Sequence, residues 1–253
     1  MYLSSTFLLF ELLGFATCEN LQKPLTGSDN VQEALKKAEI IPTGISNPPN
    51  LNPQPPTHSY LVPTNTTTPV IDDFTPLLTL TVNWPNAHAS LGNTLNPSDL
   101  QSRPNISLIT KTPPSISVSN SNFILALTDP DAPSRSNPKW SEICHWIAVN
   151  LTLSNSDSDS NLELFDFLEG RGEGDDLMPY KPPGPPPKTG KHRYVFLALK
   201  PKNGTSEPLR LERPKERQHW GRGEKGEGVR GWAGDGELEV IGANFVYAQN
   251  EEQ

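Results

Sequence analysis

The stretch Asp129-Pro130-Asp131-Ala132-Pro133-Ser134-Arg135 directly follows an apolar run, Phe-Ile-Leu-Ala-Leu-Thr, at residues 123–128. Short apolar runs bounded by turn-forming residues are typical of strands that are buried in a sheet. We therefore predict a strand over residues 123–128. It places the carboxylates of Asp129 and Asp131 at its end, where they are candidates for a functional site.

Two other apolar runs have polar residues at their entrance. Residues 146–151 are entered through His145, and residues 194–199 are entered through His192 and Arg193. If the three predicted strands are neighbours in one sheet, their polar ends gather at one rim. The sequence therefore predicts a small pocket at that rim.

The block that begins at Asp129, with His145 downstream of it, is followed by a second block, Gly184-Pro185-Pro186-Pro187-Lys188-Thr189-Gly190-Lys191-His192-Arg193-Tyr194. Together the two blocks resemble the signature stretches of the phosphatidylethanolamine-binding protein family, also called the Raf kinase inhibitor family. Two separated blocks are a more specific signal than either block alone. The resemblance runs from about residue 76 to residue 249, with a further echo at residues 241–249.

This resemblance implies an all-β fold, in which a two-sheet antiparallel β-sandwich carries short peripheral α-helices. It also implies a small, non-catalytic pocket for phospholipid headgroups or other phosphate-bearing anions. The candidate ligand-binding residues, which stand at matching positions, are Asp129, Asp131, His145, Tyr180, Gly184, His192 and Tyr194.

The chemistry of these residues suits an anion that also carries an ammonium group. His145 and His192 can donate hydrogen bonds, and a neighbouring carboxylate favours their charged form. The tyrosine hydroxyls add donors, Gly184 lets the backbone approach a ligand closely, and the carboxylates suit the ammonium end of ethanolamine. If the imidazolium is the binding form, affinity falls as pH rises through the range of about 6 to 7.

Each of these residues also has a structural interpretation. Aspartates beside prolines often cap turns, Arg135 could pair with one of them, and the two histidines could be satisfied core residues. No His-x-x-x-His, Cys-x-x-Cys or Gly-x-Ser-x-Gly pattern is present, so we expect no metal, no cofactor and no enzymatic activity. The second hypothesis for function is an interaction protein, because the family that this chain resembles includes inhibitors of serine carboxypeptidases and regulators of kinases.

The composition favours a single β-rich domain. A chain of 253 residues is within the range of large single β-domains, and its 27 prolines favour short strands over long helices. The net charge of −8 argues against a nucleic-acid binder, which needs a basic surface. It also argues against a purely electrostatic attachment to anionic lipid.

The N-terminus indicates a secretory route. Residues 7–15 form a short apolar stretch interrupted by Glu11, and small residues follow, so we predict that residues 1–18 are a signal peptide and that the protein is secreted, or lumenal or vacuolar. No transmembrane segment is expected, since about 20 uninterrupted apolar residues are needed. Cleavage after Cys18 leaves Cys144 as the one thiol, which excludes an internal disulfide. Glycosylation sequons, which agree with this route, are present at Asn65, Asn105, Asn150 and Asn203.

The rest of the chain divides into two parts. Residues 19–69 are predicted to form an N-terminal helix, over residues 30–40, and a Pro/Thr-rich arm, whereas residues 70–250 form the domain. Further strands are expected over residues 77–82 and 106–109. Residues 155–176, with eight acidic side chains and one basic, are predicted to be a dispensable surface insertion holding a short helix. Seven glycines between residues 221 and 236 argue against a helix there, at about 1 kcal/mol each relative to alanine.

Overall fold

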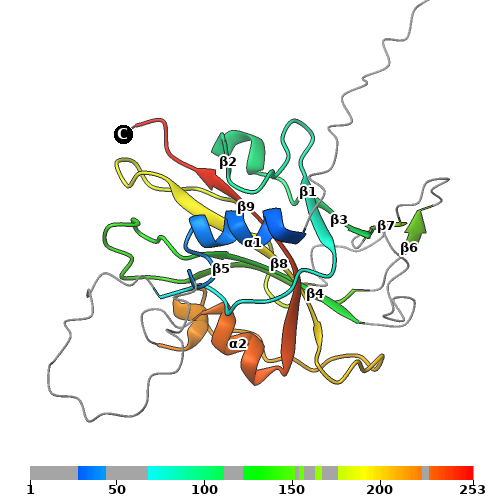
Figure 1. Ribbon diagram of the computed structural model, residues 1–253. Coiled ribbons are helices and arrows are strands. Elements are labelled where there is room, and N and C mark those ends of the chain that lie inside the picture. Colours follow the sequence, from blue (N-terminus) through cyan, green and yellow to red (C-terminus); the bar gives the residue numbers. More distant parts are fainter. Residues whose placement is uncertain are drawn as a thin grey trace, which may run out of the picture.

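The computed structural model describes residues 28–43, 68–110, 122–151, 154–156, 163–166, 176–223 and 228–252 (Figure 1). The helices are α1 (Ser28–Lys37) and α2 (Val229–Asp235), with 3₁₀ turns at Pro97–Leu100 and His219–Gly221. The strands are β1 (Thr79–Asn83), β2 (Asn93–Leu95), β3 (Asn105–Thr110), β4 (Phe123–Asp129), β5 (Ile143–Leu151), β6 (Ser154–Ser156), β7 (Glu163–Asp166), β8 (His192–Pro201) and β9 (Leu238–Ala248). Strands thus outweigh helices in the described part, as predicted.

The strands form two sheets. The larger sheet has the order β2-β9-β8-β4-β5, and the smaller has the order β1-β3-β7-β6. The three strands that carry the predicted site, β8, β4 and β5, are therefore neighbours, which confirms the prediction. The expectation of purely antiparallel sheets is wrong at one edge, because β2 pairs with β9 in parallel. All other pairs within the sheets are antiparallel.

The two central strands of the larger sheet are buried on both faces. Successive side chains of a strand point to opposite faces. In β4, Phe123, Leu125 and Leu127 belong to one buried cluster, and Ile124 and Ala126 belong to the other. β8 divides its side chains in the same way. A strand covered on both faces reads as a continuous apolar run, which is why β4 and β8 were recognisable in the sequence.

One of these clusters joins the two sheets. It contains Leu80 and Val82 of β1 and Ile106 and Leu108 of β3, together with Trp146 and other residues of the larger sheet. The second cluster lies on the opposite face of the larger sheet. There α1 and α2 cover the strands, and Figure 1 shows α1 lying across β8 and β9. The larger sheet is therefore the central layer of the molecule.

Helix α1 confirms the amphipathic helix predicted over residues 30–40, although it begins at Ser28 and ends at Lys37. Val31, Leu35 and Ala38 are buried against the larger sheet, while Glu33 and Lys37 are exposed. The apolar spacing of this segment thus correctly identified the face that packs on the core.

Helix α2 corrects the prediction that the glycine-rich segment forms no helix. Val229, Trp232 and Ala233 are buried in the cluster that covers the larger sheet, and this burial outweighs the low helix propensity of glycine. Gly228, at the start of the helix, lies close to a buried carboxylate. A Cβ at that position would lie 2.2 Å from the carboxyl carbon of the buried Glu142.

The acidic segment also differs from its prediction. Part of it forms strand β7, which pairs with β3 over four residues and with β6 over three, so the short helix predicted there is wrong. The two strands extend the smaller sheet at the edge beyond β3. The segment therefore contributes backbone hydrogen bonds to the domain and is not only a surface insertion.

Several other predictions concern residues at the margins of the described ranges. The predicted signal peptide, Asn65 and all but the last two residues of the Pro/Thr-rich arm predicted to end at residue 69 lie outside them. Cys144 is buried and free, and burial raises the pKa of its thiol.

The described sequon asparagines differ in their surroundings. The side-chain amide of Asn150 is hydrogen-bonded to the backbone of Leu209, whereas Asn105 and Asn203 are exposed.

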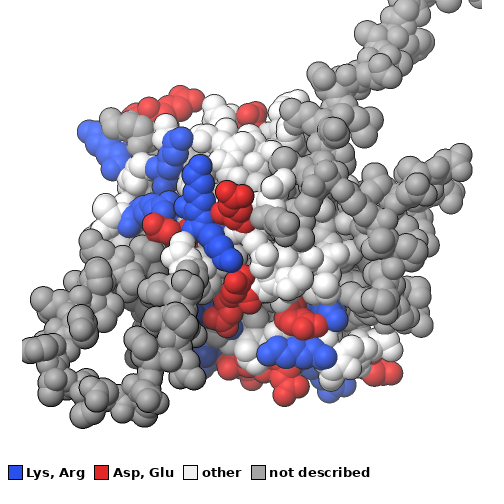
Figure 2. Space-filling model, in the orientation of Figure 1, with Lys and Arg blue, Asp and Glu red and all other residues white. Residues whose placement is uncertain are grey.

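Within the described ranges, no helix has the length and apolar character needed to cross a membrane. The described part of the face in Figure 2 carries Lys and Arg side chains close to Asp and Glu side chains. This face is therefore of mixed charge, with neither sign covering it alone.

The pairing of β6 and β7 generates a stability prediction. Replacing residues 157–162, which connect the two strands, by a short Gly/Ser linker is expected to leave the melting temperature within about 2 °C, because loop length changes closure entropy little. Replacing residues 154–166 removes the strands and exposes the edge of β3. We expect a loss of about 1 to 2 kcal/mol, or roughly 2 to 8 °C in melting temperature by calorimetry. Equal melting temperatures for the two variants would contradict this structural role.

Candidate functional site

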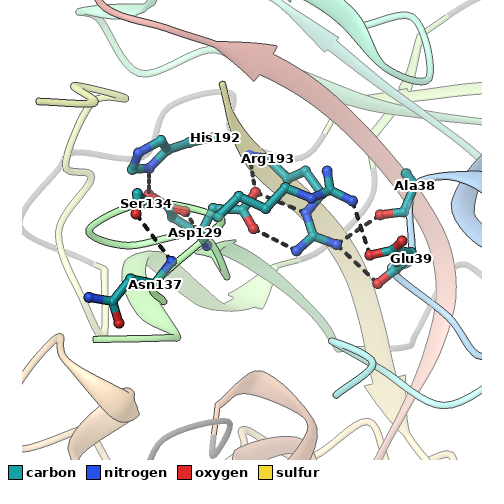
Figure 3. A network of polar contacts seen from close by, with 9 residues as sticks. Ala38, Glu39, Asp129, Ser134, Asn137, His192 and Arg193 are labelled. Atoms are coloured by element: carbon teal, nitrogen blue, oxygen red, sulfur yellow. Dashed lines mark hydrogen bonds and ion pairs between the residues drawn. The ribbon is translucent and has the colours of Figure 1, made fainter. Parts of the chain in front are cut away.

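Asp129 and His192 form the centre of the predicted site. Asp129 is the last residue of β4 and His192 the first of β8, and Nδ1 of His192 donates a hydrogen bond of 2.9 Å to Oδ2 of Asp129 (Figure 3). The other carboxylate oxygen, Oδ1, accepts the backbone N–H of Asp131 at 2.7 Å. Both side chains are buried. The antiparallel pairing of β4 with β8 thus brings together two residues that lie 63 positions apart.

The hydrogen bonds of His192 indicate that it carries a positive charge. The hydroxyl of Thr189 donates to the carbonyl of Pro186 at 2.7 Å, so its oxygen is left to accept from Nε2 of His192 at 3.0 Å. Both ring nitrogens of His192 then act as donors. Burial lowers the pKa of His192, but the hydrogen bond with Asp129 and the charges of Asp129 and Asp131 outweigh it, so the pKa lies above its ordinary value.

His145 reaches the site through an irregularity in β5. Leu127 of β4 pairs with Trp146, and the next residue, Thr128, pairs with Cys144, so His145 is the extra residue of a β-bulge. Bulges of this kind redirect a side chain. Nδ1 of His145 donates to the carbonyl of Lys181 at 2.8 Å, and the N–H of Lys181 donates back to the carbonyl of His145 at 2.8 Å. These two bonds fix the orientation of the ring.

The electrostatic state of His145 differs from that of His192. Burial lowers the pKa of His145 to about 4; the charge of Asp129 and the hydrogen bond to Lys181 oppose this shift, whereas the charges of Lys181 and Arg217 add to it. At neutral pH the ring is therefore neutral, with its proton on Nδ1 and a lone pair on Nε2. Of the two protonation states that the sequence left open, the neutral imidazole is favoured at His145 and the charged form at His192.

Tyr194 lies between the two histidines. Its ring stands edge-on to His145 at 5.3 Å and stacks with His192 at 6.3 Å between ring centroids. Burial and then the charge of Asp129 raise the pKa of its hydroxyl, while a hydrogen bond with the backbone of Gly184 acts in the opposite direction. Gly184 itself is exposed, and a Cβ there would meet only Pro182 O, at 4.0 Å. The structure thus brings together Asp129, His145, Gly184, His192 and Tyr194.

Asp131 serves a different purpose from the one predicted. Its carboxylate forms a two-pronged ion pair with Arg193, with Nη2 at 2.6 Å from Oδ1 and Nε at 2.9 Å from Oδ2, and it also accepts the N–H of Arg193 at 2.8 Å. Arg193 then donates to the carbonyls of Ala38 and Glu39 at 2.8 and 3.0 Å (Figure 3). Asp131 therefore holds Arg193 of β8, and Arg193 in turn binds the segment that follows α1.

Arg135 is not the ion-pair partner of Asp129 or Asp131 that the sequence suggested. It pairs instead with the exposed carboxylate of Glu39 at 3.1 Å. Tyr180 also has a structural contact, since its hydroxyl donates to the carbonyl of Leu100 at 2.9 Å and its ring stands edge-on to Trp146 at 5.7 Å. Asp131 and Tyr180 thus support the site through neighbouring elements.

Several residues of the site were not anticipated from the sequence. Thr189 is hydrogen-bonded to His192, and Lys181 is hydrogen-bonded to His145. Arg217 stabilises the start of β5 by donating to the carbonyls of Cys144, His145 and Pro179 at 3.0, 3.0 and 2.8 Å. Thr189 lies three residues before His192, so its proximity could have been inferred from the sequence. Arg217 lies 72 residues from His145 and gives no local signal.

The model of the phosphatidylethanolamine-binding protein family matches residues 85–245, which include every predicted site residue. The chain belongs to this family. Among its relatives in the family, the carboxypeptidase Y inhibitor of Saccharomyces cerevisiae is 33% identical over 178 residues, which is 66% of this chain and 81% of that protein. The resemblance stated from the two sequence blocks is thereby confirmed.

Solved structures agree with membership of the phosphatidylethanolamine-binding protein family. A crystal structure of carboxypeptidase Y inhibitor complexed with the cognate proteinase is 33% identical, with a TM-score of 0.60, over 70% of this chain and 86% of that chain. A phosphatidylethanolamine-binding protein from Plasmodium falciparum is 22% identical, with a TM-score of 0.50, over 86% and 96% of the two chains. At this lower identity, the second match supports the fold alone.

Among the residues that the structure describes, no group of three or more His, Cys, Asp or Glu side chains is arranged to hold a metal ion. Asp129, His145, His192 and Tyr194 instead form a network of hydrogen bonds and ring contacts. This arrangement can hold a proton or accept a hydrogen-bonding ligand at His145, whose Nε2 makes no hydrogen bond with a described residue.

The Asp131–Arg193 ion pair generates a prediction about stability. Arg193→Met leaves the carboxylate of Asp131 buried without its partner, so we expect a loss of about 3 to 5 kcal/mol in the free energy of unfolding, measured by urea denaturation. The matched control is Arg135→Met, which breaks an exposed ion pair and is expected to cost less than about 1 kcal/mol. The double variant Arg193→Met/Asp131→Asn is expected to recover part of the loss. Equal losses for the two single variants would show that the buried pair has no special role.

Proposed function

We propose that this protein binds a phosphate-bearing anion without catalysis, with a phospholipid headgroup as the class of ligand, at the site formed by His145, Tyr194 and Gly184. The observation that carries the proposal is the uncommitted Nε2 of His145, which is held in a fixed direction by the bulge in β5 and by Lys181. The exposed backbone at Gly184 lies beside Tyr194 and leaves room for a ligand to approach.

The charges around His145 support this proposal. The carboxylate of Asp129 is balanced by the charged His192, and Asp131 is balanced by Arg193. Burial is the main cause of the lowered pKa of His145, and among the charges Asp129 raises this pKa while the cations Lys181 and Arg217 lower it. An incoming anion therefore meets paired carboxylates and two nearby cations.

An anion at Nε2 of His145 requires one shared proton. In the free protein this nitrogen carries a lone pair, and two electron-rich atoms repel each other unless a proton lies between them. A phosphate diester has no proton of its own, so the imidazole must take one up from solution. A phosphate monoester retains a proton on oxygen below about pH 6 and can donate it to Nε2.

This requirement predicts different pH dependences for two probes. Because the free pKa of His145 is about 4, the affinity for glycerophosphoethanolamine, a diester, is expected to fall about tenfold per pH unit above pH 4. Between pH 4.5 and 6 the loss is about 30-fold, whereas the affinity for phosphoethanolamine, a monoester, changes less than about threefold. Calorimetric titration of both probes across this range measures the difference.

Two variants accompany these titrations. His145→Ala is expected to lose about 1 to 3 kcal/mol of binding to either probe, the usual effect of removing a hydrogen bond to a charged group. His88→Ala, which replaces an exposed histidine outside the site, is the control and is expected to bind like the unaltered protein. Unchanged binding in folded His145→Ala would sink the proposal for this site.

A second candidate function is inhibition of a carboxypeptidase. It is supported by the 33% identity to carboxypeptidase Y inhibitor over 81% of that protein. In this function the surface of the protein would form the contact with the enzyme, whether or not the anion site is occupied. Secretion, or residence in a lumenal or vacuolar compartment, would place the protein beside such an enzyme.

Inhibition of carboxypeptidase Y tests this second candidate. The purified protein is expected to slow hydrolysis of a peptide substrate at micromolar concentration or below, and to form a stable complex in size-exclusion chromatography. His145→Ala separates the two functions, because it is expected to weaken phosphate binding and to leave inhibition unchanged. An absence of both inhibition and complex formation at 10-fold molar excess of the protein would rule out this enzyme as a partner.

A further inference from the structure

A second cavity lies away from the predicted site, between the loop over residues 210–222 and the C-terminal end of α2. Its volume is about 750 Å³, which is in the range of small-molecule sites. Its wall includes the basic side chains Arg210, Arg213, Lys215 and Arg222, and the indoles of Trp220 and Trp232. None of the seven predicted ligand-binding residues lines it.

Two nearly buried indoles border this cavity. Trp220 and Trp232 are 2% and 7% exposed, and their ring centroids are 5.5 Å apart. Their polar atoms are already used, because Nε1 of Trp220 donates to Oγ1 of Thr128 at 3.0 Å and Nε1 of Trp232 donates to the carbonyl of Glu212 at 2.9 Å. The rings are therefore fixed, and the small part of each ring that reaches the cavity offers apolar contact rather than hydrogen bonds.

The charge of the cavity is opposite to that of the whole chain. Its wall holds four basic side chains and two acidic ones, Glu212 and Asp235, in a protein whose net charge is −8. Arg222 pairs with Asp235. Arg210, Arg213 and Lys215 form no ion pair with any residue that the structure describes, so their charges remain available for an anion.

The loop that carries these cations is anchored at two points. Arg217 donates to three backbone carbonyls, as described above, and the N–H of Cys144 donates to the carbonyl of Arg217 at 2.8 Å. Gly221 has a φ of +69°, and a Cβ there would lie 2.7 Å from the backbone nitrogen of Lys215. The close approach of Gly221 to Lys215 requires glycine and fixes the backbone beneath the basic side chains.

We propose that this cavity is a second anion site, which takes a small organic phosphate. The phosphate would lie among Arg210, Arg213 and Lys215, and the apolar part of the ligand would pack against Leu211 and the small exposed part of the two indoles. Such a ligand could be a soluble phosphate ester or the headgroup of a phospholipid, since both offer the same charge. The site is independent of His145.

Calorimetric titration with phenyl phosphate tests the proposal, because this probe combines a phosphate with an aromatic ring. The test variant is Arg213→Gln/Lys215→Gln, in which both altered side chains are exposed in the native protein, so folding is expected to be retained. The matched control is Lys37→Gln/Lys188→Gln, which also removes two exposed positive charges but lies outside the cavity. We expect the test variant to bind at least tenfold more weakly than the control.

His145→Ala separates the two sites. If the second site exists, His145→Ala retains binding of phenyl phosphate that is lost in Arg213→Gln/Lys215→Gln. Equal binding by the test variant and its control in both the phenyl phosphate and the vesicle assay, or a single binding event abolished by His145→Ala alone, overturns the proposal. Co-sedimentation with phosphatidic acid vesicles forms the second arm. If the unaltered protein binds the vesicles but not the soluble ester, and vesicle binding is lost in the test variant, a lipid headgroup is identified as the source of the phosphate.

Discussion

The guanidinium of Arg193 and the carboxylate of Asp131 meet in the interior of the protein, where each charge would be costly without the other. The backbone N–H of Asp131 also donates a hydrogen bond to the carboxylate of Asp129, and the same carboxylate accepts a hydrogen bond from His192. On its other side, Arg193 binds the carbonyls of Ala38 and Glu39, which directly follow α1. The helix, the sheet and the candidate site therefore share one continuous network, in which the charge of every member is matched by a neighbour.

Much of this arrangement could be predicted from the sequence, because the central strands are covered on both faces and so appear as continuous apolar runs. The polar residues at their ends then converge through strand pairing. Adjacent residues of a strand point to opposite faces of the sheet. This alternation explains why His192 faces the candidate site whereas Arg193 faces the segment after α1. What local patterns did not predict was the element behind the second face. The partners of Arg193 are the carbonyls of Ala38 and Glu39, more than 150 residues earlier in the chain.

Other features were hidden for different physical reasons. The bulge at His145 depends on the register between β4 and β5, which no single strand specifies. The neutral state of His145 depends on its burial, whereas the sequence showed only that a nearby carboxylate favours the charged form. Helix α2 forms despite its glycines because Val229 and Trp232 are buried on the sheet. In each case a tertiary contact outweighs the preference of the local segment.

The hydrogen bonds of Arg193 to the segment after α1 affect the order in which parts of the protein can fold. The ribosome completes α1 long before Arg193, which lies 155 residues after Ala38. At about 5 to 20 residues per second, the apolar face of α1 has no sheet to cover for roughly 8 to 30 s. During that time Val31, Leu35 and Ala38 are open to chaperones and to other chains. Docking of α1 is therefore a late event, coupled to the pairing of β8 with β4. A chain interrupted before β8 retains an α1 helix whose apolar face is exposed to solvent.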